Sequence, residues 1–202
     1  MSRIIETSQR NPSCAVIDDA VATLAFGGVV VMPTDSVYGV GCAATESNPA
    51  HERIFELKAR PREMALPWLI ADPSDLARFA ADLSPEAMEL ALAHWPGALT
   101  LVVRASDEVP SEYASADGTI ALRVPDSPLV REIARRAGPL ATTSANLHGQ
   151  ASATSGADID PALAEAVDLV LDAGPAPIAV ESTIVDVAHG EPRILRVGAL
   201  KL

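Results

Sequence analysis

Aromatic residues are scarce in this chain: Phe, Trp and Tyr make up 3% of its 202 residues. Ala, Val, Leu and Ile must therefore pack most of the core, and the hydrophobic share of 49% is ample for a domain of this length. Long apolar runs are also missing, since no stretch approaches the roughly 18–20 residues that span a bilayer. The N-terminal residues lack the charged-then-apolar order of a signal peptide. These absences predict a cytoplasmic protein without a membrane segment.

Cysteine and histidine are too few and too scattered to build a metal site. Cys14 and Cys42 form no disulfide framework and lack metal-type spacing, so the favoured interpretation is that each is a small hydrophobic residue. No two histidines stand in an HxxxH or HxH pair; they are His51, His94, His148 and His189. The sequence therefore predicts no metal site.

Positive charge is in short supply, with 15 Lys and Arg against 27 Asp and Glu and a net charge of −12. Such an acidic surface repels phosphate backbones and disfavours tight nonspecific binding of nucleic acid. A small nucleotide needs only a few local cations in a cleft, so nucleotide binding stays open.

Segments of strand-like and helix-like periodicity alternate along the chain, which predicts an α/β fold. A first helix is expected from Asp18 and Asp19 to Gly27, a second over Pro49–Lys58, and others after a capping residue followed by proline. Those capping residues are Ser84, Ser127 and Asp160. Strands are expected at 29–32, 66–71, 100–103, 119–124, 140–143, 169–171, 183–187 and 194–196. The close spacing of the last strands indicates that part of the sheet is antiparallel.

The stretch PTDSVYGVG follows a buried strand and is the first candidate for a binding site. Ligands bind where strands of α/β sheets end, and Thr34, Ser36 and Tyr38 place hydroxyl groups there. Gly39 and Gly41 would allow close approach of the backbone. A tight turn whose polar groups satisfy its own backbone explains the same residues equally well.

Two stretches offer cations. In ELKARPRE, Lys58 and Arg60 could anchor a polyphosphate, or they could stabilise the C-terminus of a helix against its dipole. No GxxxxGK[ST] pattern exists, so this is not a P-loop. In ALRVPDSP, Arg123 stands near a strand end and could hold a carboxylate or phosphate with two hydrogen bonds, or be a surface cation.

Three later stretches offer further polar side chains, most of them with hydroxyl groups. The loop PLATTSANLHG could present hydroxyls, an amide and backbone N–H groups to phosphate oxygens. A serine nucleophile is disfavoured there, because no GxSxG pattern is present. The stretches ESTIVDV and ILRVG follow near late strand ends. The polar residues of these stretches are Thr142, Thr143, Ser144, Asn146, Ser182, Thr183 and Arg196.

Taken in order, seven motifs resemble those of the YrdC/Sua5 family, the threonylcarbamoyl-AMP synthases. They stand here as PTDSVYGVG, KARP, PGALTL, RVPDSP, TSANLHG, STIVD and LRVG, over about residues 18–200. The resemblance implies one domain covering residues 1–202, with a twisted, mixed parallel and antiparallel sheet and flanking helices around a concave cleft. The chain ends just after LRVGAL, so it is expected to resemble the short, single-domain form.

The resemblance also implies an activity: L-threonine, bicarbonate and ATP would give threonylcarbamoyl-AMP and pyrophosphate, with Mg²⁺ accompanying ATP. The product would serve threonylcarbamoyladenosine formation at position 37 of tRNA, so downstream tRNA-threonylcarbamoyl transfer proteins are expected partners. Direct tRNA binding is expected to be weak or absent. A double-stranded RNA or tRNA-binding module of the same fold is the main alternative, and a carbamoyl transferase component is a third.

By resemblance, Lys58 and Arg60 would hold the ATP phosphates and act in catalysis. Threonine would meet Thr34, Ser36, Arg123, Ser144 and Ser182. The nucleotide would also meet Thr119, Asn146, Thr154 and Arg196. No general base is evident, so catalysis is expected to rest on positioning and charge neutralisation. Which of Thr34 and Ser36 contacts threonine is left open.

Five positions depart from the family pattern. Family prolines are replaced at Ala65, Ala98 and Val197, a histidine at Ser127 and a serine at His148. These changes affect the stiffness of loops rather than the charged residues.

Overall fold

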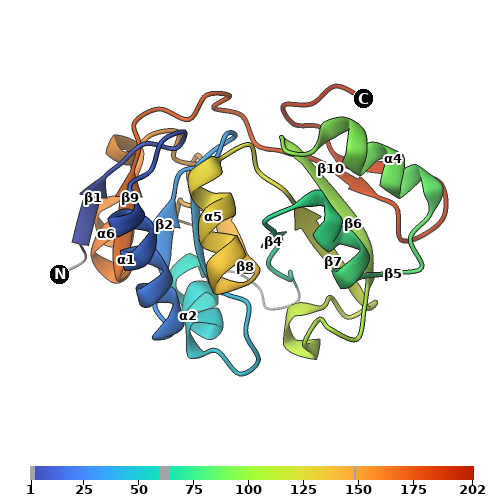
Figure 1. Cartoon of the computed structure of the whole chain (residues 1–202), viewed down its shortest axis with the longest axis horizontal. Coiled ribbons are helices and arrows are strands. Elements are labelled where there is room, and N and C mark those ends of the chain that lie inside the picture. Colours follow the sequence, from blue (N-terminus) through green and yellow to red (C-terminus); the bar gives the residue numbers. More distant parts are fainter. Residues whose placement is uncertain (1–2, 60–63, 148) are drawn as a thin grey trace.

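The computed structural model describes residues 3–59, 64–147 and 149–202, which form an eleven-stranded mixed sheet flanked by helices (Figure 1). The strands run in the order β1-β9-β2-β3-β8-β4-β7-β6-β10-β11, and β5 pairs with β6. The strands are β1 Arg3–Glu6, β2 Val30–Met32, β3 Gly39–Ala43, β4 Trp68–Leu69, β5 Ala80–Ala81, β6 Leu99–Ala105, β7 Thr119–Arg123, β8 Leu140–Ser144, β9 Leu169–Asp172, β10 Thr183–Asp186 and β11 Arg193–Arg196. The α-helices are α1 Cys14–Ala25, α2 Pro49–Lys58, α3 Leu76–Phe79, α4 Pro85–His94, α5 Pro128–Ala137 and α6 Pro161–Ala166.

The sheet confirms the predicted α/β class and its mixed character. β9 pairs in parallel with both β1 and β2, and β10 pairs in parallel with β6. Antiparallel pairs join β2 to β3, β3 to β8, β6 to β7, and β10 to β11. The predicted antiparallel pairing of late strands is therefore confirmed for β10 and β11. β9 instead lies near the other edge of the sheet, in parallel between β1 and β2.

The predicted boundaries hold for α2 and for the helices that follow a capping residue and a proline. The side chains of Ser84, Ser127 and Asp160 accept hydrogen bonds from backbone N–H groups of the first turns of α4, α5 and α6. The predicted start of α1 is wrong by about one and a half turns, because Ser13 rather than Asp18 or Asp19 caps the helix and accepts from Val16 N. Gly27, with φ of 72°, follows its last turn as expected.

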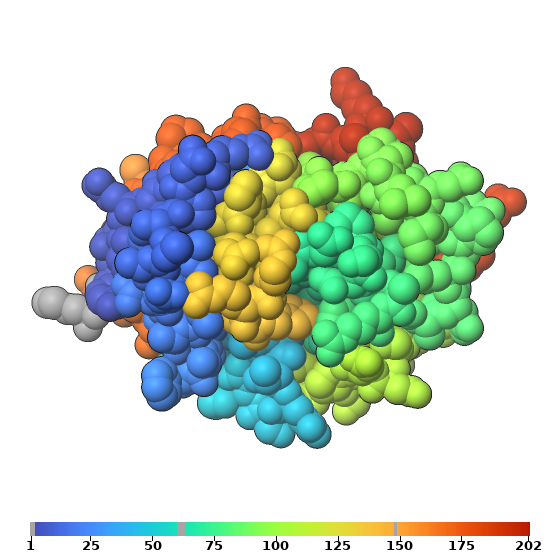
Figure 2. All heavy atoms as spheres, in the orientation of Figure 1, coloured from blue at the N-terminus to red at the C-terminus, as the bar shows by residue number. Residues whose placement is uncertain are grey.

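Two apolar layers lie on opposite faces of the sheet. Alternation along β2 sends Val30 and Met32 to the layer that contains α1 and α5, while Val29 and Val31 join the layer that contains α2 and α4. Helices α1 and α5 lie side by side over the sheet (Figure 1). In the space-filling view, the yellow segment of α5 fills the surface between the blue N-terminal part and the green part that follows residue 64 (Figure 2).

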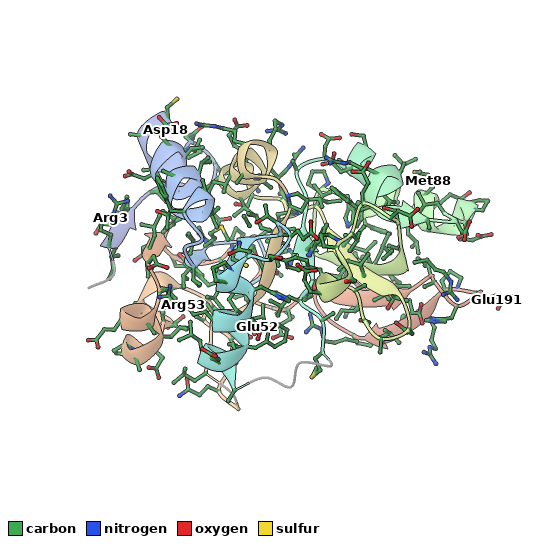
Figure 3. The ribbon with its side chains drawn as sticks, turned by 90° about the horizontal axis from the view of Figure 1, so that it is seen from below. Arg3, Asp18, Glu52, Arg53, Met88 and Glu191 are labelled. Carbon is green, nitrogen blue, oxygen red and sulfur yellow. The ribbon has the colours of Figure 1, made fainter. Side chains whose placement is uncertain are left out.

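Charged side chains gather at the periphery, where Arg3, Asp18 and Glu191 lie in the side-chain view (Figure 3). Exposed ion pairs such as Arg136–Asp18, at 2.6 Å, contribute little stability. Among the helices of the described residues, none combines the length and the apolar character that a membrane crossing requires.

Candidate functional site

A cavity of about 370 Å³ opens where several strand ends meet. The turn after β2 forms one wall, the end of β8 a second, and the ends of β7, β10 and β11 bring their side chains to the same space. Residues that line it include Thr34, Ser36, Val37, Gly39, Leu69, Thr100, Arg123, Thr143, Ser144, Glu181, Ser182, Ile184 and Arg196. The topology thus joins five of the candidate stretches of the sequence in one place.

The turn after β2 is organised by the hydroxyl group of Thr34. Thr34 Oγ1 donates to Val37 O at 2.6 Å and accepts from the backbone N–H groups of Ser36 and Val37 at 3.2 and 3.3 Å. Because the only Thr34 hydroxyl proton goes to Val37, Ser36 must donate in the 3.0 Å contact between the two hydroxyls. Ser36 Oγ accepts from Arg123 Nη1 at 2.7 Å and keeps one acceptor position. Thr34 therefore stabilises the turn, whereas Ser36 can still accept from a ligand.

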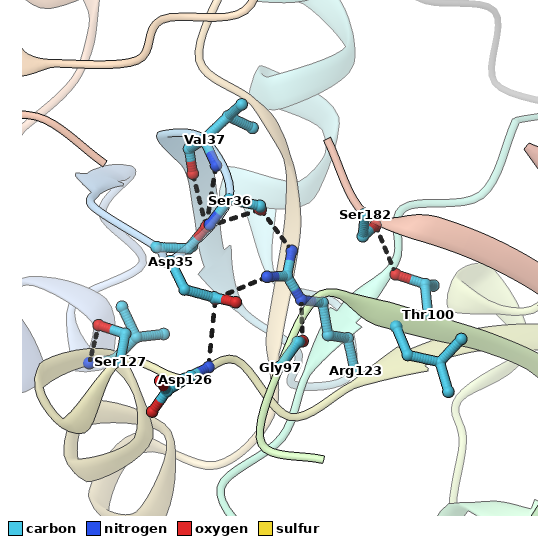
Figure 4. A network of polar contacts seen from close by, with 12 residues as sticks. Asp35, Ser36, Val37, Gly97, Thr100, Arg123, Asp126, Ser127 and Ser182 are labelled. Atoms are coloured by element: carbon cyan, nitrogen blue, oxygen red, sulfur yellow. Dashed lines mark hydrogen bonds and ion pairs between the residues drawn. The ribbon is translucent and has the colours of Figure 1, made fainter. Parts of the chain in front are cut away.

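Arg123 is buried at the end of β7 and is held from three sides (Figure 4). Its Nε donates to Gly97 O at 2.9 Å, its Nη1 to Ser36 Oγ, and its Nη2 pairs with Asp35 Oδ1 at 2.6 Å. Burial lowers the pKa of the Arg123 guanidinium, nearby Arg196 lowers it further, and Asp35 opposes both effects. The group stays protonated, because an arginine guanidinium does not lose its proton in proteins.

A second polar group lies across the cavity, around Ser182. Thr100 Oγ1 and Ser182 Oγ are 2.8 Å apart, and Arg196 donates to Ser182 O at 3.1 Å and to Ser182 Oγ at 3.2 Å. Arg196 Nη1 also pairs with Glu181 Oε2 at 2.5 Å. Arg123 and Arg196, the arginines of the described residues that line the cavity, are thus each paired with a carboxylate.

Lys58, at the end of α2, joins that helix to the end of β8. Its buried ammonium donates to Ser144 O at 2.8 Å, to Asn146 Oδ1 at 2.5 Å and to Asn146 O. Ser144 Oγ donates to Asn146 Oδ1 at 2.6 Å. The lysine therefore orders the segment that places Ser144 in the cavity wall.

The structure brings together six of the predicted site residues in the cavity wall: Thr34, Ser36, Arg123, Ser144, Ser182 and Arg196. Lys58 and Asn146 lie directly behind Ser144. Thr119 stands at the other end of β7, roughly 13 Å from Arg123 at about 3.3 Å per residue, and donates to Asp117. Thr154 donates to Asp158 and does not line the cavity. Arg60 and His148 lie outside the described residues.

Three residues of the site were missed by the sequence analysis: Asp35, Thr100 and Glu181. Asp35 and Glu181 stand inside motifs that were singled out, PTDSVYGVG and ESTIVDV, next to a residue that was chosen. Thr100 lay in an expected strand and in the PGALTL motif, but no role was predicted for it. These residues belong to the site because they contact Arg123, Arg196 and Ser182. Such contacts depend on the tertiary structure and could not be predicted from the sequence.

Gly41 serves the sheet rather than a ligand. A Cβ at Gly41 would lie 2.4 Å from Thr142 Cγ2 and 2.7 Å from Ala141 O on the neighbouring strand β8. At Gly39, which lines the cavity, the nearest atom is an ordinary 3.5 Å away. The two glycines of the motif thus have different roles.

A metal ion finds no ready set of ligands in the part of the chain that the structure describes. No group of three His, Cys, Asp or Glu side chains converges there. The cavity-lining carboxylate of Glu181 accepts from Ser152 Oγ at 2.7 Å and pairs with Arg196.

The fold and the cavity define an α/β protein with a polar cavity at its strand ends, lined by Arg123 and Arg196. Residues 22–198 match the family model of Sua5, YciO and YrdC, described as "Telomere recombination". The chain belongs to this family.

Relatives and solved structures agree with this membership. A threonylcarbamoyl-AMP synthase of Stenotrophomonas maltophilia (strain K279a) is 36% identical over 181 residues, which are 86% of this chain and 95% of that protein. The crystal structure of P. abyssi Sua5 complexed with L-threonine has a TM-score of 0.89 at 34% identity, covering 98% of this chain and 58% of that chain. E. coli YciO has a TM-score of 0.88 at 29% identity, covering 98% and 96%. The present chain thus spans a little over half of the P. abyssi protein and nearly all of YciO.

Proposed function

We propose that this protein makes threonylcarbamoyl-AMP from L-threonine, bicarbonate and ATP, with release of pyrophosphate, and that residues 1–202 act as one domain. The observation that carries the proposal is the cavity in which Arg123, Ser144, Ser182 and Arg196 converge from four strand ends. Family membership and the name of the S. maltophilia relative support it. The product would pass to proteins that transfer threonylcarbamoyl to position 37 of tRNA.

The amino-acid substrate would bind beside Arg123. The guanidinium retains two N–H bonds beyond its three contacts within the described residues, and they suit the threonine carboxylate. Ser36, rather than Thr34, has an acceptor position left for the threonine amine or hydroxyl. Ser144 and Ser182 would complete the contacts from the opposite walls. The complex of P. abyssi Sua5 with L-threonine supports this choice of ligand.

The nucleotide would bind on the side of Arg196 and Lys58. Arg196 could exchange its bond to Glu181 for a phosphate oxygen, and Lys58 could exchange one of its oxygen acceptors near Asn146. Arg60 would add a second cation from the segment after α2. Contacts from Thr119 and Thr154 to the nucleotide stay predictions. Mg²⁺ would accompany ATP as part of the substrate.

The residues of the cavity support catalysis by positioning. The threonine amine combines with bicarbonate to give a carbamate and water, and the carbamate oxygen then attacks the α-phosphate of ATP as pyrophosphate leaves. No histidine is among the described residues that line the cavity, and its carboxylate, Glu181, is engaged by Arg196. The chain's own contribution is to align carbamate and phosphate, to neutralise their charges and to limit access of water.

The test is to incubate the protein with ATP, Mg²⁺, bicarbonate and L-threonine and to search for the mixed anhydride by mass spectrometry. Pyrophosphate should appear in equal amount, and it should depend on both bicarbonate and threonine. L-Serine, offered as a competitor, should be used less well. Pyrophosphate release without the adduct, or no reaction with any amino acid, would contradict the proposed function.

A further inference from the structure

Asp35 lies at the centre of the turn after β2, between Thr34 and Ser36, and its side chain is 3% exposed. Its Oδ1 accepts from Arg123 Nη2 at 2.6 Å and from Asp126 N at 3.1 Å (Figure 4). Its backbone oxygen accepts from Ile178 N at 2.9 Å. One residue thus ties the turn to the end of β7, to the segment before α5 and to the segment between β9 and β10.

The second carboxylate oxygen of Asp35 is also buried, and it has no hydrogen-bond partner among the described residues. A buried carboxylate is tolerated when a nearby cation balances its charge, and the ion pair with Arg123 supplies that balance. The same pairing neutralises the buried guanidinium. Asp35 and Arg123 therefore depend on each other.

The three contacts of Arg123 differ in strength. All three bonds have the charged guanidinium as donor, but Gly97 O and Ser36 Oγ are neutral acceptors, whereas the Asp35 carboxylate carries the opposite charge, so only this contact is also an ion pair. Asp35 is itself held through Asp126 N and through its own backbone. It is thus the contact that fixes the direction of the guanidinium plane.

We propose that Asp35 is a positioning residue of the amino-acid site, which fixes the Arg123 guanidinium so that its remaining N–H bonds meet the substrate carboxylate. The proposal rests on the proposed function, since it takes L-threonine as the ligand of Arg123. Asp35 does not line the cavity, so its effect on the ligand passes through Arg123.

The test compares binding of L-threonine and of L-threonine amide, which lacks the carboxylate, to purified protein by calorimetry. The unchanged protein should prefer the acid. In Asp35→Asn, affinity for L-threonine should fall about tenfold, because a misdirected contact commonly loses that much or more. Affinity for the amide should stay the same, so the ratio of the affinities for L-threonine and for its amide becomes smaller. Asp35→Glu, which keeps the charge but moves the oxygen, should show the same narrowing and serves if the first variant fails to fold.

Asp186→Asn is the matched control, because the Asp186 side chain is 5% exposed and pairs with His189 at 3.0 Å and Arg193 at 3.5 Å outside the cavity. It should lower Tm and leave the preference between acid and amide unchanged. A folded Asp35→Asn protein with unchanged or increased affinity for L-threonine would overturn the positioning role alone. Failure of the unchanged protein to bind L-threonine would overturn the proposed function as well.

Discussion

Arg123 uses three different nitrogen atoms for its contacts with Gly97, Ser36 and Asp35. A lysine has one nitrogen and cannot reach three separated acceptors while offering further N–H bonds to a ligand. We therefore expect Arg123→Lys to raise the threonine KM by about tenfold or more and to change the ATP KM little. Steady-state kinetics with each substrate varied in turn would check this. An unchanged threonine KM would show that the carboxylate binds elsewhere.

Lys58 is the second residue whose substitution tests a proposed role, here in binding ATP. Without its ammonium, Ser144 O, Asn146 O and Asn146 Oδ1 lose a shared donor, and ATP loses a proposed cation. Lys58→Ala should lower kcat/KM for ATP by about a hundredfold or more, measured as pyrophosphate release. Arg60→Ala should act in the same direction. The chain offers an exposed control in Lys201→Ala, which should behave as the unchanged protein; persistent release in Lys58→Ala would contradict the assignment.

At the scale of elements, Ser127 shows how a departure from the family pattern is accommodated. Fully buried, it caps α5 by accepting from Val130 N at 3.5 Å and donates to Pro33 O at 3.3 Å, directly before the turn that carries Asp35. Ser127→Ala should lower the free energy of unfolding by about 1–3 kcal/mol, because both a cap and a buried hydrogen bond are lost.

Ser84→Ala removes the equivalent cap of α4, which accepts from Ala87 N at 3.1 Å away from the turn. It should lower the free energy of unfolding by about 1 kcal/mol. Urea unfolding of both variants checks the difference. Equal losses would mean that the bond from Ser127 to Pro33 contributes nothing.

Strand β3 marks the limit of what local pattern could predict about the fold. No strand was predicted at Gly39–Ala43, because Gly39 and Gly41 belong to the PTDSVYGVG stretch that was interpreted as a turn or a binding site, yet all its residues are buried between β2 and β8. The starts of helices that follow a cap and a proline were predictable because both signals act locally, whereas the start of α1, which has no such proline, was not. Strands β1, β3 and β5 were not predicted: β1 pairs with the distant strand β9, β3 contains two glycines, and β5 is only two residues long.

For the candidate site, too, local signals were predictable and tertiary contacts were not. Polar residues at strand ends identified Arg123, Ser144, Ser182 and Arg196, because strand ends converge in α/β sheets. The sequence could not predict that the Thr34 hydroxyl group donates within its own turn, since that depends on one 2.6 Å bond to Val37 O. The carboxylates that pair with the guanidinium groups were not predicted either, because these contacts also depend on the tertiary structure.

At the scale of the whole molecule, Tyr38 makes the stability of the folded state depend on pH in the alkaline range. It is fully buried, donates to Gly174 O at 2.6 Å, and burial raises the pKa of Tyr38 to about 12. The folded state thus holds the phenolic proton more tightly than the unfolded state, so this stabilisation is complete below pH 10 and is lost as pH rises through 12.

The measurement is Tm between pH 8 and pH 11.5 for the unchanged protein and for Tyr38→Phe. Below pH 10 the unchanged protein should be the more stable, because Tyr38→Phe leaves Gly174 O without its donor. The gap should narrow above pH 10. A constant gap over the whole range would show that the phenol has the same pKa in both states.

The net charge of −12 favours the enzyme over the RNA-binding alternative. Binding of an RNA duplex gains free energy from the release of counterions by lysine and arginine, and the cavity guanidinium groups here are already paired with Asp35 and Glu181. We therefore expect a fluorescent tRNA or RNA duplex to show no binding at about 0.15 M salt and protein concentrations up to roughly 10 μM. Formation of threonylcarbamoyl-AMP should proceed without RNA in the same buffer. Micromolar binding with a steep salt dependence, in a preparation that releases no pyrophosphate, would favour the RNA-binding module instead.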